Sequence, residues 1–333
     1  MVLALLLYIS ISQASDIVWE DFYKRDVMLC YKNELVRNYT KIKNYLVTTS
    51  IFTRLSDTVI VFQNDDTIKL LVSGSKFISI SQNNRQGCDI YMLYGGCIIH
   101  NIMSYNVTKS HVYTYLNTSN TNKANFFLSS MDVCNTNSYG AIQFKFGDVQ
   151  YSDNNISNTI SSFYASENLW FDKSNGVTSF SNCFNNTATV TGIIFHYGLP
   201  YSTIRYYNII SNKVTSSYTN YNSAIVSTGF YGLKLTNSVL VDNVSPNLFY
   251  VTYNGYITVD STYIKDNSFT YSCSFTDSGG SFSITTTSSF DINFGEYTDT
   301  DALTFIIQAK KCSNSPKKSV GDYLILLANS VTE

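Results

Sequence analysis

A short pattern, an apolar residue followed three positions later by Asn, returns every 21 to 31 residues through most of this chain. The interval averages about 26 residues, which is typical of one coil of a solenoid. The asparagines that end the pattern are Asn83, Asn106, Asn137, Asn158, Asn186, Asn212, Asn243, Asn267 and Asn293, and the copy at Asn158 is weak because Asn155 stands in place of the apolar residue. The pattern therefore predicts a chain built from stacked repeats.

Two other elements recur in step with these asparagines. A Gly or polar turn followed by alternating apolar and polar residues precedes several of them, as in Gly147–Tyr151 and Gly232–Leu235, and such alternation is typical of a strand. A second short apolar run follows them, as in Ile142–Phe144 and Leu248–Tyr250. Each repeat thus supplies about three short strands separated by turns.

Repeats of this kind cannot bury an apolar face alone, but stacked in parallel they bury a continuous column and satisfy the backbone groups between neighbouring coils. We predict an all-β fold, a single-stranded right-handed parallel β-helix of about nine to ten coils with an N-terminal cap. The asparagines are expected to form a structural ladder, because Asn tolerates a left-handed turn and its amide can bond to an amide in the next coil.

The predicted boundaries are a signal peptide at 1–14, an N-terminal cap and first coil at 15–60, the β-helix at 61–299, and a C-terminal strand and tail at 300–333. Charged and apolar residues between Trp19 and Tyr45 mix near helical spacing, which predicts a short amphipathic helix in the cap, followed by strands of the first coil. Such a cap is needed because the end of a β-helix is an open sheet edge. Leu303–Ala309 is expected to form the last strand.

The N-terminus resembles a secretory signal. Val2–Ile11 is a short apolar run, and Ser12 and Ala14 are the small residues of a cleavage site after Ala14. No Lys or Arg precedes the run, so a truncated gene start and a buried first element are the alternatives. No other segment approaches the roughly 18 apolar residues of a membrane span. We therefore expect a secreted or extracellular surface protein without a membrane span.

The turn pattern, with its Phe form in Phe290–Asn293, alternates with a strand resembling Gly-Gly-Ala-Ile, as in Gly140–Ile142 and Ser223–Ile225. Over residues 60 to 295, this alternation resembles the right-handed β-helix repeats of trichomonad surface-protein families and of chlamydial polymorphic outer membrane proteins. The resemblance implies a role in adhesion. It also implies surface display, and a secreted or protozoan version resembles this chain better than the bacterial one, because no barrel-forming stretch follows.

The charge of the chain argues against nucleic-acid binding, and its cysteines bear on disulfide bridges and metal sites. A formal net charge of -2 gives no electrostatic basis for nucleic-acid binding, and the lysines between Lys310 and Lys318 are read as a solvated tail. Seven Cys is an odd number, so at least one thiol stays outside any intramolecular bridge. Cys134 and Cys183 are expected in the core, whereas Cys88 with Cys97 and Cys273 with Cys312 are the favoured bridges. No Cys or His pair has metal-ligand spacing, so we expect no metal or cofactor.

Carbohydrate-active enzymes also use β-helices, and they need clustered carboxylates with a cationic partner. Asp242 and Asp266 take the same place in adjacent repeats, and Lys265 precedes Asp266, so these three residues are the best catalytic candidates. The alternative is that they are exposed turn residues without chemistry. No nucleophile elbow or phosphate-binding loop accompanies them.

We therefore predict a non-enzymatic β-helix that acts in adhesion or surface recognition of host or neighbouring-cell proteins or glycans. The alternative is a β-helical polysaccharide lyase or glycoside hydrolase. Exposed tyrosines in the loops are candidates for stacking on sugars or anchoring a protein. Asn117, in a polar stretch, is the best glycosylation candidate among six sequons, and six is no more than an Asn-rich chain has by chance.

Overall fold

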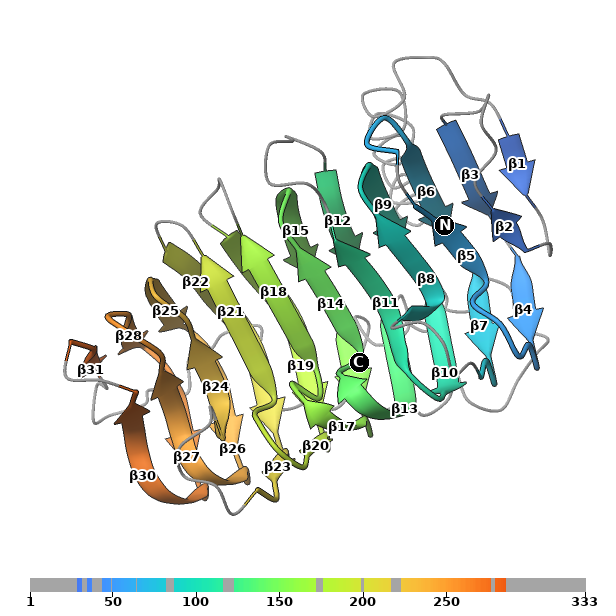
Figure 1. The fold of residues 1–333 in the computed structure, drawn as a ribbon. Coiled ribbons are helices and arrows are strands. Elements are labelled where there is room, and N and C mark those ends of the chain that lie inside the picture. Colours follow the sequence, from blue (N-terminus) through green and yellow to red (C-terminus); the bar gives the residue numbers. More distant parts are fainter. Residues whose placement is uncertain are drawn as a thin grey trace, which may run out of the picture.

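The computed structural model describes residues 29–31, 35–37, 44–48, 50–63, 65–81, 87–115, 123–171, 176–198, 201–216, 223–276 and 279–285. Within these ranges the chain forms 31 strands that join into one sheet and wind into a solenoid of stacked turns. Figure 1 shows the turns stacked along one axis. The all-β parallel solenoid predicted from the sequence is confirmed, and the described part contains no helix. Among the described residues there is likewise no helix long and apolar enough to cross a membrane.

Each turn contributes strands to three faces, and strands on one face pair in parallel with the turns before and after. The first face consists of β1 (Leu29–Tyr31), β3 (Asn44–Thr48), β6 (Lys69–Ser73), β9 (Gly96–His100), β12 (Lys123–Phe127), β15 (Asp148–Ser152), the first parts of β19 (Gly176–Phe184) and β22 (Tyr201–Ile210), β25 (Gly232–Thr236), β28 (Tyr256–Asp260) and β31 (Ser281–Thr285).

The second face begins after a sharp corner. It consists of β4 (Ile51–Thr53), β7 (Lys76–Ile78), β10 (Met103–Val107), the first part of β13 (Ser130–Tyr139), β16 (Asn155–Ser157), the second parts of β19 and β22, β26 (Val239–Val241) and β29 (Tyr263–Lys265).

The third face closes each turn. It consists of β2 (Val36–Arg37), β5 (Ile60–Phe62), β8 (Gly87–Leu93), β11 (Ser110–Tyr115), β14 (Ile142–Lys145), β18 (Glu167–Phe171), β21 (Ile194–Gly198), β24 (Ala224–Thr228), β27 (Val244–Val251) and β30 (Ser268–Phe275), with the short strands β17 (Ile160–Phe163), β20 (Thr187–Ala188) and β23 (Lys213–Val214) ahead of β18, β21 and β24.

The core is a column of apolar side chains that runs through the solenoid. Val72, Ile99 and Phe126 occupy one register position in three consecutive turns, and all are fully buried. Ile204 and Leu235 continue the same position further along the chain. Because side chains alternate across a strand, every second residue enters this column, and burying one large apolar side chain stabilises the fold by about 1.5–3 kcal/mol.

The corner between the second and third faces bends the chain through one left-handed residue per turn. Between the second and third faces, the residues with positive φ are Arg54, Ser79, Asn106, Val133, Asn158, Asn185, Ser211, Asp242 and Asp266. Non-glycine residues adopt this conformation at a cost of about 1 kcal/mol each. The backbone ladder continues through the corner nevertheless, since the N–H of Asn185 donates to the carbonyl of Ile210 and that of Ser211 to Val241.

The N-terminal region differs from the prediction. Residues 19–28 lie outside the described part, but Leu29–Tyr31 and Val36–Arg37, which belong to the predicted amphipathic helix, form strands β1 and β2. The helical interpretation is wrong there, because these strands gain parallel partners in β3 and β5 that outweigh local helical spacing. The predicted signal peptide and the predicted last strand at Leu303–Ala309 lie outside the described residues.

Candidate functional site

Four of the predicted ladder asparagines form one continuous column. Asn186, Asn212, Asn243 and Asn267 stack in successive turns, and each side-chain Oδ1 accepts the backbone N–H of the asparagine one turn earlier, at 3.0, 2.9 and 2.9 Å. The same oxygens also accept from the preceding Nδ2, at 3.1, 3.1 and 2.8 Å. Thr159 extends the column, since its backbone N–H donates to Asn186 Oδ1. At this corner, the side-chain Oδ1 of one asparagine thus takes the place of a backbone carbonyl as the acceptor for the backbone N–H of the turn before.

The ladder asparagines are not themselves the left-handed residues. The positive φ belongs to the residue before each of them, such as Asn185 or Asp242. Asn106 and Asn158 occupy this left-handed position and so lie one residue out of the ladder, with their amides directed to Ser79 Oγ and Asp132 Oδ1. The side chain of Asn137 lies outside the described part of the structure, as do Asn83, Asn293 and the glycosylation candidate Asn117.

In the earlier turns apolar residues fill the ladder position. The register places Val107 and Cys134 there, directly after the left-handed residues Asn106 and Val133. Both side chains are buried. The solenoid thus satisfies the same corner in two ways, with apolar packing in its N-terminal turns and an amide ladder in its C-terminal turns.

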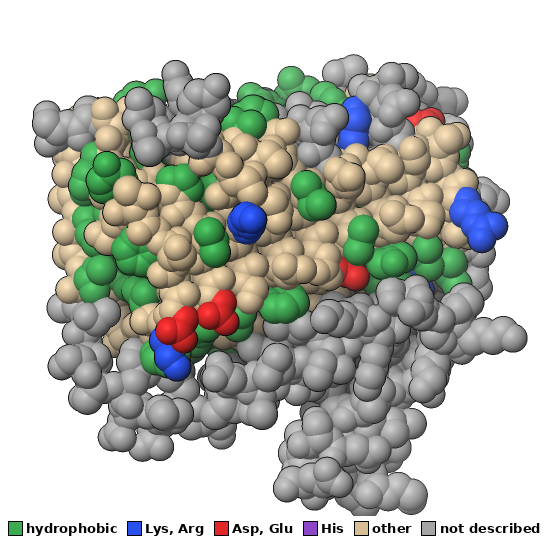
Figure 2. Space-filling model, turned by 90° about the horizontal axis from the view of Figure 1, so that it is seen from below, with side chains coloured by type: hydrophobic (Ala, Val, Ile, Leu, Met, Phe, Trp, Pro, Cys, Tyr) green, Lys and Arg blue, Asp and Glu red, His purple; other side chains and the backbone are tan. Residues whose placement is uncertain are grey.

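The catalytic candidates Asp242, Asp266 and Lys265 lie at this corner on the outside of the solenoid. The side chains of Lys265 and Asp266 are 57% and 62% exposed, and their charged atoms lie 3.6 Å apart. Asp242 is also exposed, and its backbone N–H donates to the Lys265 carbonyl. Figure 2, seen from below, shows few acidic and basic side chains among the hydrophobic and other described residues of this face. All three residues are therefore exposed at this corner, and the Lys265–Asp266 ion pair is not part of a shielded carboxylate cluster.

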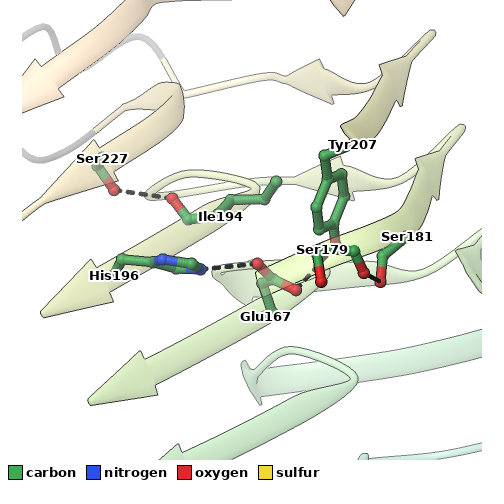
Figure 3. Close-up of polar contacts among 7 residues, drawn as sticks. All are labelled: Glu167, Ser179, Ser181, Ile194, His196, Tyr207 and Ser227. Carbon is green, nitrogen blue, oxygen red and sulfur yellow. Dashed lines mark hydrogen bonds and ion pairs between the residues drawn. The ribbon is translucent and has the colours of Figure 1, made fainter. Parts of the chain in front are cut away.

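A buried polar network links the third face to the second. Glu167 on β18 accepts a hydrogen bond from the hydroxyl of Tyr207 on β22 at 2.8 Å, and its other oxygen lies 2.8 Å from His196 Nε2 on β21. Figure 3 shows both side chains pointing at the carboxyl group. Burial, with repulsion from Glu167, raises the pKa of Tyr207 well above its ordinary value. Because all three side chains are fully buried, the network holds the core together and has no access to a ligand.

A similar network lies nearer the N-terminus. Asp89 on β8 accepts from the hydroxyl of Ser104, and the same carboxylate oxygen lies 3.2 Å from His111 Nδ1. Burial raises the pKa of Asp89, and the contacts with His111 and Ser104 only partly oppose this shift. In the described residues, no group of three or more His, Cys, Asp or Glu side chains could hold a metal ion.

The cysteines adopt simple roles. Cys134 and Cys183 are both buried in the core, as predicted. Only Cys183 takes the expected position of the repeat, level with Ile209, whereas Cys134 lies at the ladder position beside Val107. Cys97 and Cys273 are free thiols, so the predicted bridges Cys88–Cys97 and Cys273–Cys312 are not formed. Cys97 points into the core, because it occupies the same register position as the buried residues Leu70 and Ala124 of the adjacent turns. It packs there as a small apolar side chain.

A row of aromatic side chains runs along the solenoid where the third face ends. Figure 1 shows β14, β18, β21 and β24 side by side along this face. The aromatic row consists of Tyr115, Phe146, Trp170, Tyr197, Phe230 and Tyr253, with successive ring centroids 5.5, 5.9, 4.8, 6.0 and 3.8 Å apart. Its contacts link each turn to the next, so the row forms an unbroken series of rings across six strand ends.

Neighbouring groups fix the rings in place. The indole N–H of Trp170 donates to Asn168 Oδ1 at 2.7 Å, and the Lys145 ammonium lies 5.1 Å from the indole ring centroid. Tyr197 lies against Gly229, where an added Cβ would come within 2.8 Å of its ring. Phe230 and Tyr253 end the row and are each 47% exposed. The rings in the middle of the row are therefore held by their neighbours, and the two rings at its C-terminal end are exposed to solvent.

Sequence reasoning considered exposed tyrosines singly and did not find this row. Its residues follow the repeat at uneven distances: Tyr197 comes 11 residues after Asn186, whereas Phe230 comes 18 after Asn212. The usable signal is the end of each third-face strand, which carries a ring in most of these turns. Comparisons with known proteins add nothing to the assignment, since no protein-family model, curated protein or solved structure matches the chain.

Proposed function

We propose that this chain is a non-enzymatic β-helical recognition module, secreted or displayed at a cell surface, that binds a protein or glycan partner through the aromatic row. The row itself carries the proposal, because large aromatic side chains held on a rigid scaffold supply contact area with little loss of conformational entropy on binding. A solenoid repeats that contact along its axis and so offers an extended surface for adhesion.

The open end of the row is the expected centre of binding. Phe230 and Tyr253 stack at 3.8 Å with nearly parallel rings. Tyr256, which begins the next strand and is 42% exposed, packs against Gly232. Aromatic residues are enriched among the few side chains that dominate binding free energy. We therefore expect the last three turns to contribute most of the affinity.

The alternative of a carbohydrate-active enzyme receives less support. Acid and base catalysts need carboxyl groups in distinct, partly shielded environments that separate their roles. Asp242 and Asp266 are both exposed at a corner, and Lys265 is paired with Asp266. No observation at this corner favours turnover over a solvated turn.

The test compares the unaltered chain with Phe230→Ala/Tyr253→Ala on one panel of immobilised polysaccharides and extracellular-matrix proteins. Tyr271→Ala is the matched control, since Tyr271 is 52% exposed on β30, away from the row. We expect binding to a panel member that the double variant loses and the control keeps. Product release that disappears in Asp242→Ala or Asp266→Ala would instead support the enzyme. Equal binding by all variants would refute the proposed site.

A further inference from the structure

We propose that the ligand of the aromatic row is a linear, uncharged glycan whose chain lies along the solenoid axis. This inference rests on the proposed function and specifies its ligand.

The direction of the row suits a ligand that repeats. Tyr115 to Tyr253 form an unbroken series in which each ring contacts the next, and the turns that carry them are about 4.8 Å apart. Such a line offers similar contacts at each turn and has no single pocket. A linear glycan presents one sugar ring after another, each with an apolar C–H face that packs on aromatic carbon.

The chemistry of the turns suits a neutral ligand. Residues 228–232 and 251–256, which surround the exposed end of the row, contain Thr, Gly, Val, Asn, Phe and Tyr but no Asp, Glu, Lys or Arg. The hydroxyls of Tyr253 and Tyr256 and the amide of Asn254 lie on exposed residues. Hydroxyl and amide groups can both donate and accept, as sugar hydroxyls require. A uronic acid or sulfated chain would need several cationic side chains along the row. Among the described residues, Lys145 is the cation placed over one of its rings.

The rings are held before any ligand arrives. Trp170 is fixed by Asn168 and stacks on Tyr197 at 4.8 Å, while Tyr197 and Tyr256 rest on the backbone of Gly229 and Gly232. A ligand therefore loses less free energy in ordering the site. This matters for sugars, because each ring contact is weak and affinity must build up along the chain.

Trp170 supplies a direct spectroscopic probe. The sequence contains two tryptophans, Trp19 and Trp170, so the Trp19→Phe variant leaves one reporter inside the row. We would titrate this variant with di-, tetra- and hexasaccharides of β-1,4-glucan, β-1,3-glucan, mannan, xylan and N-acetylglucosamine. Oligogalacturonates of equal length provide the charged comparison.

The expected result is a change in Trp170 emission with at least one neutral series, with affinity that rises with chain length and is unaffected by salt. Phe230→Ala/Tyr253→Ala should weaken hexasaccharide binding about tenfold or more, the effect of losing a central aromatic contact, whereas Tyr271→Ala should not. Circular dichroism of each variant shows whether the fold is kept.

Three outcomes would overturn the inference. Affinity independent of chain length would exclude a ligand laid along the axis, and binding only to oligogalacturonates with strong salt dependence would exclude a neutral one. If no neutral series binds while a protein of the panel binds through Phe230 and Tyr253, the proposed function stands and this ligand assignment fails. If the row variants change nothing in either experiment, both proposals fail.

Discussion

Asn212 Oδ1 lies 3.0 Å from the backbone nitrogen of Asn186, one turn earlier, and accepts its N–H. Both residues are fully buried, so this side chain provides the acceptor that the bent backbone at the corner does not. The relation repeats from Asn243 to Asn212 and from Asn267 to Asn243. The C-terminal turns therefore depend on amide chemistry at a position where the earlier turns depend on packing.

Asn212→Ala should destabilise the chain by about 2–4 kcal/mol, because it leaves the buried N–H of Asn186 and the Oδ1 of Asn243 with fewer partners. Chemical denaturation measures this loss. Asn135→Ala, on an exposed strand position of β13, is the control and should stay within about 0.5 kcal/mol of the unaltered chain. Equal stability of the two variants would contradict a structural ladder.

Glu167→Leu should destabilise the protein by about 2–5 kcal/mol, since His196 Nε2 and the Tyr207 hydroxyl both lose their buried acceptor. Glu167→Gln keeps one carbonyl oxygen and should recover part of the loss. The order of unfolding midpoints, unaltered chain above Gln above Leu, checks the prediction. A Leu variant as stable as the unaltered chain would show that the network contributes nothing net.

Asp89 should make stability fall as pH rises. Burial raises its pKa above the ordinary value of 3.8, so the folded chain holds this proton more tightly than the unfolded chain does. The loss of stability caused by ionising the buried Asp89 is absent below pH 3.8. It grows as the pH rises towards the folded-state pKa and is constant above it. We expect the stability of the His111→Gln variant relative to Asp89→Asn/His111→Gln to decrease over that window.

Comparing those two variants removes the titration of His111, the ionisable group that touches Asp89. Ser104, the other contact, does not titrate in this range. Unfolding in urea at a series of pH values gives the difference directly. A difference that rises with pH would mean that hydrogen bonds to the carboxylate outweigh its burial, and would reverse the sign of the prediction.

Native Cys97 and Cys183 should resist alkylation. Burial raises the pKa of both thiols to about 12, so at pH 8 almost no thiolate is present and the side chains are also inaccessible. Iodoacetamide labelling followed by mass spectrometry should modify them only after unfolding in denaturant. Rapid labelling in the native chain would show that the core opens far more readily than its packing indicates.

The period and strand pattern were predictable because they follow from burial. Gly147–Tyr151 and Gly232–Leu235 alternate apolar and polar residues and form β15 and β25 with shifts of one residue at the ends. A sequence pattern measured in steps of about 26 residues is insensitive to such shifts. This is why the architecture could be predicted without any related protein.

The position of each asparagine within the corner was harder to predict. The left-handed residue and the ladder residue are adjacent, and Asn suits both, so Asn158 and Asn186 look alike in sequence although they occupy different columns. Apolar residues such as Val107 also satisfy the ladder position, which removes the signal from the earlier turns. The aromatic row was missed because loops of unequal length separate its members from the repeat.

Parallel pairing only between adjacent turns makes this molecule extensible. Each strand bonds to the turn before and the turn after, as β25 does to β22 and β28. Inserting or deleting one whole repeat would change the length by about 4.8 Å and leave every other interface intact. Duplication or loss of the segment that encodes one repeat would thus change the length of the solenoid in small steps, without rebuilding the rest of the core.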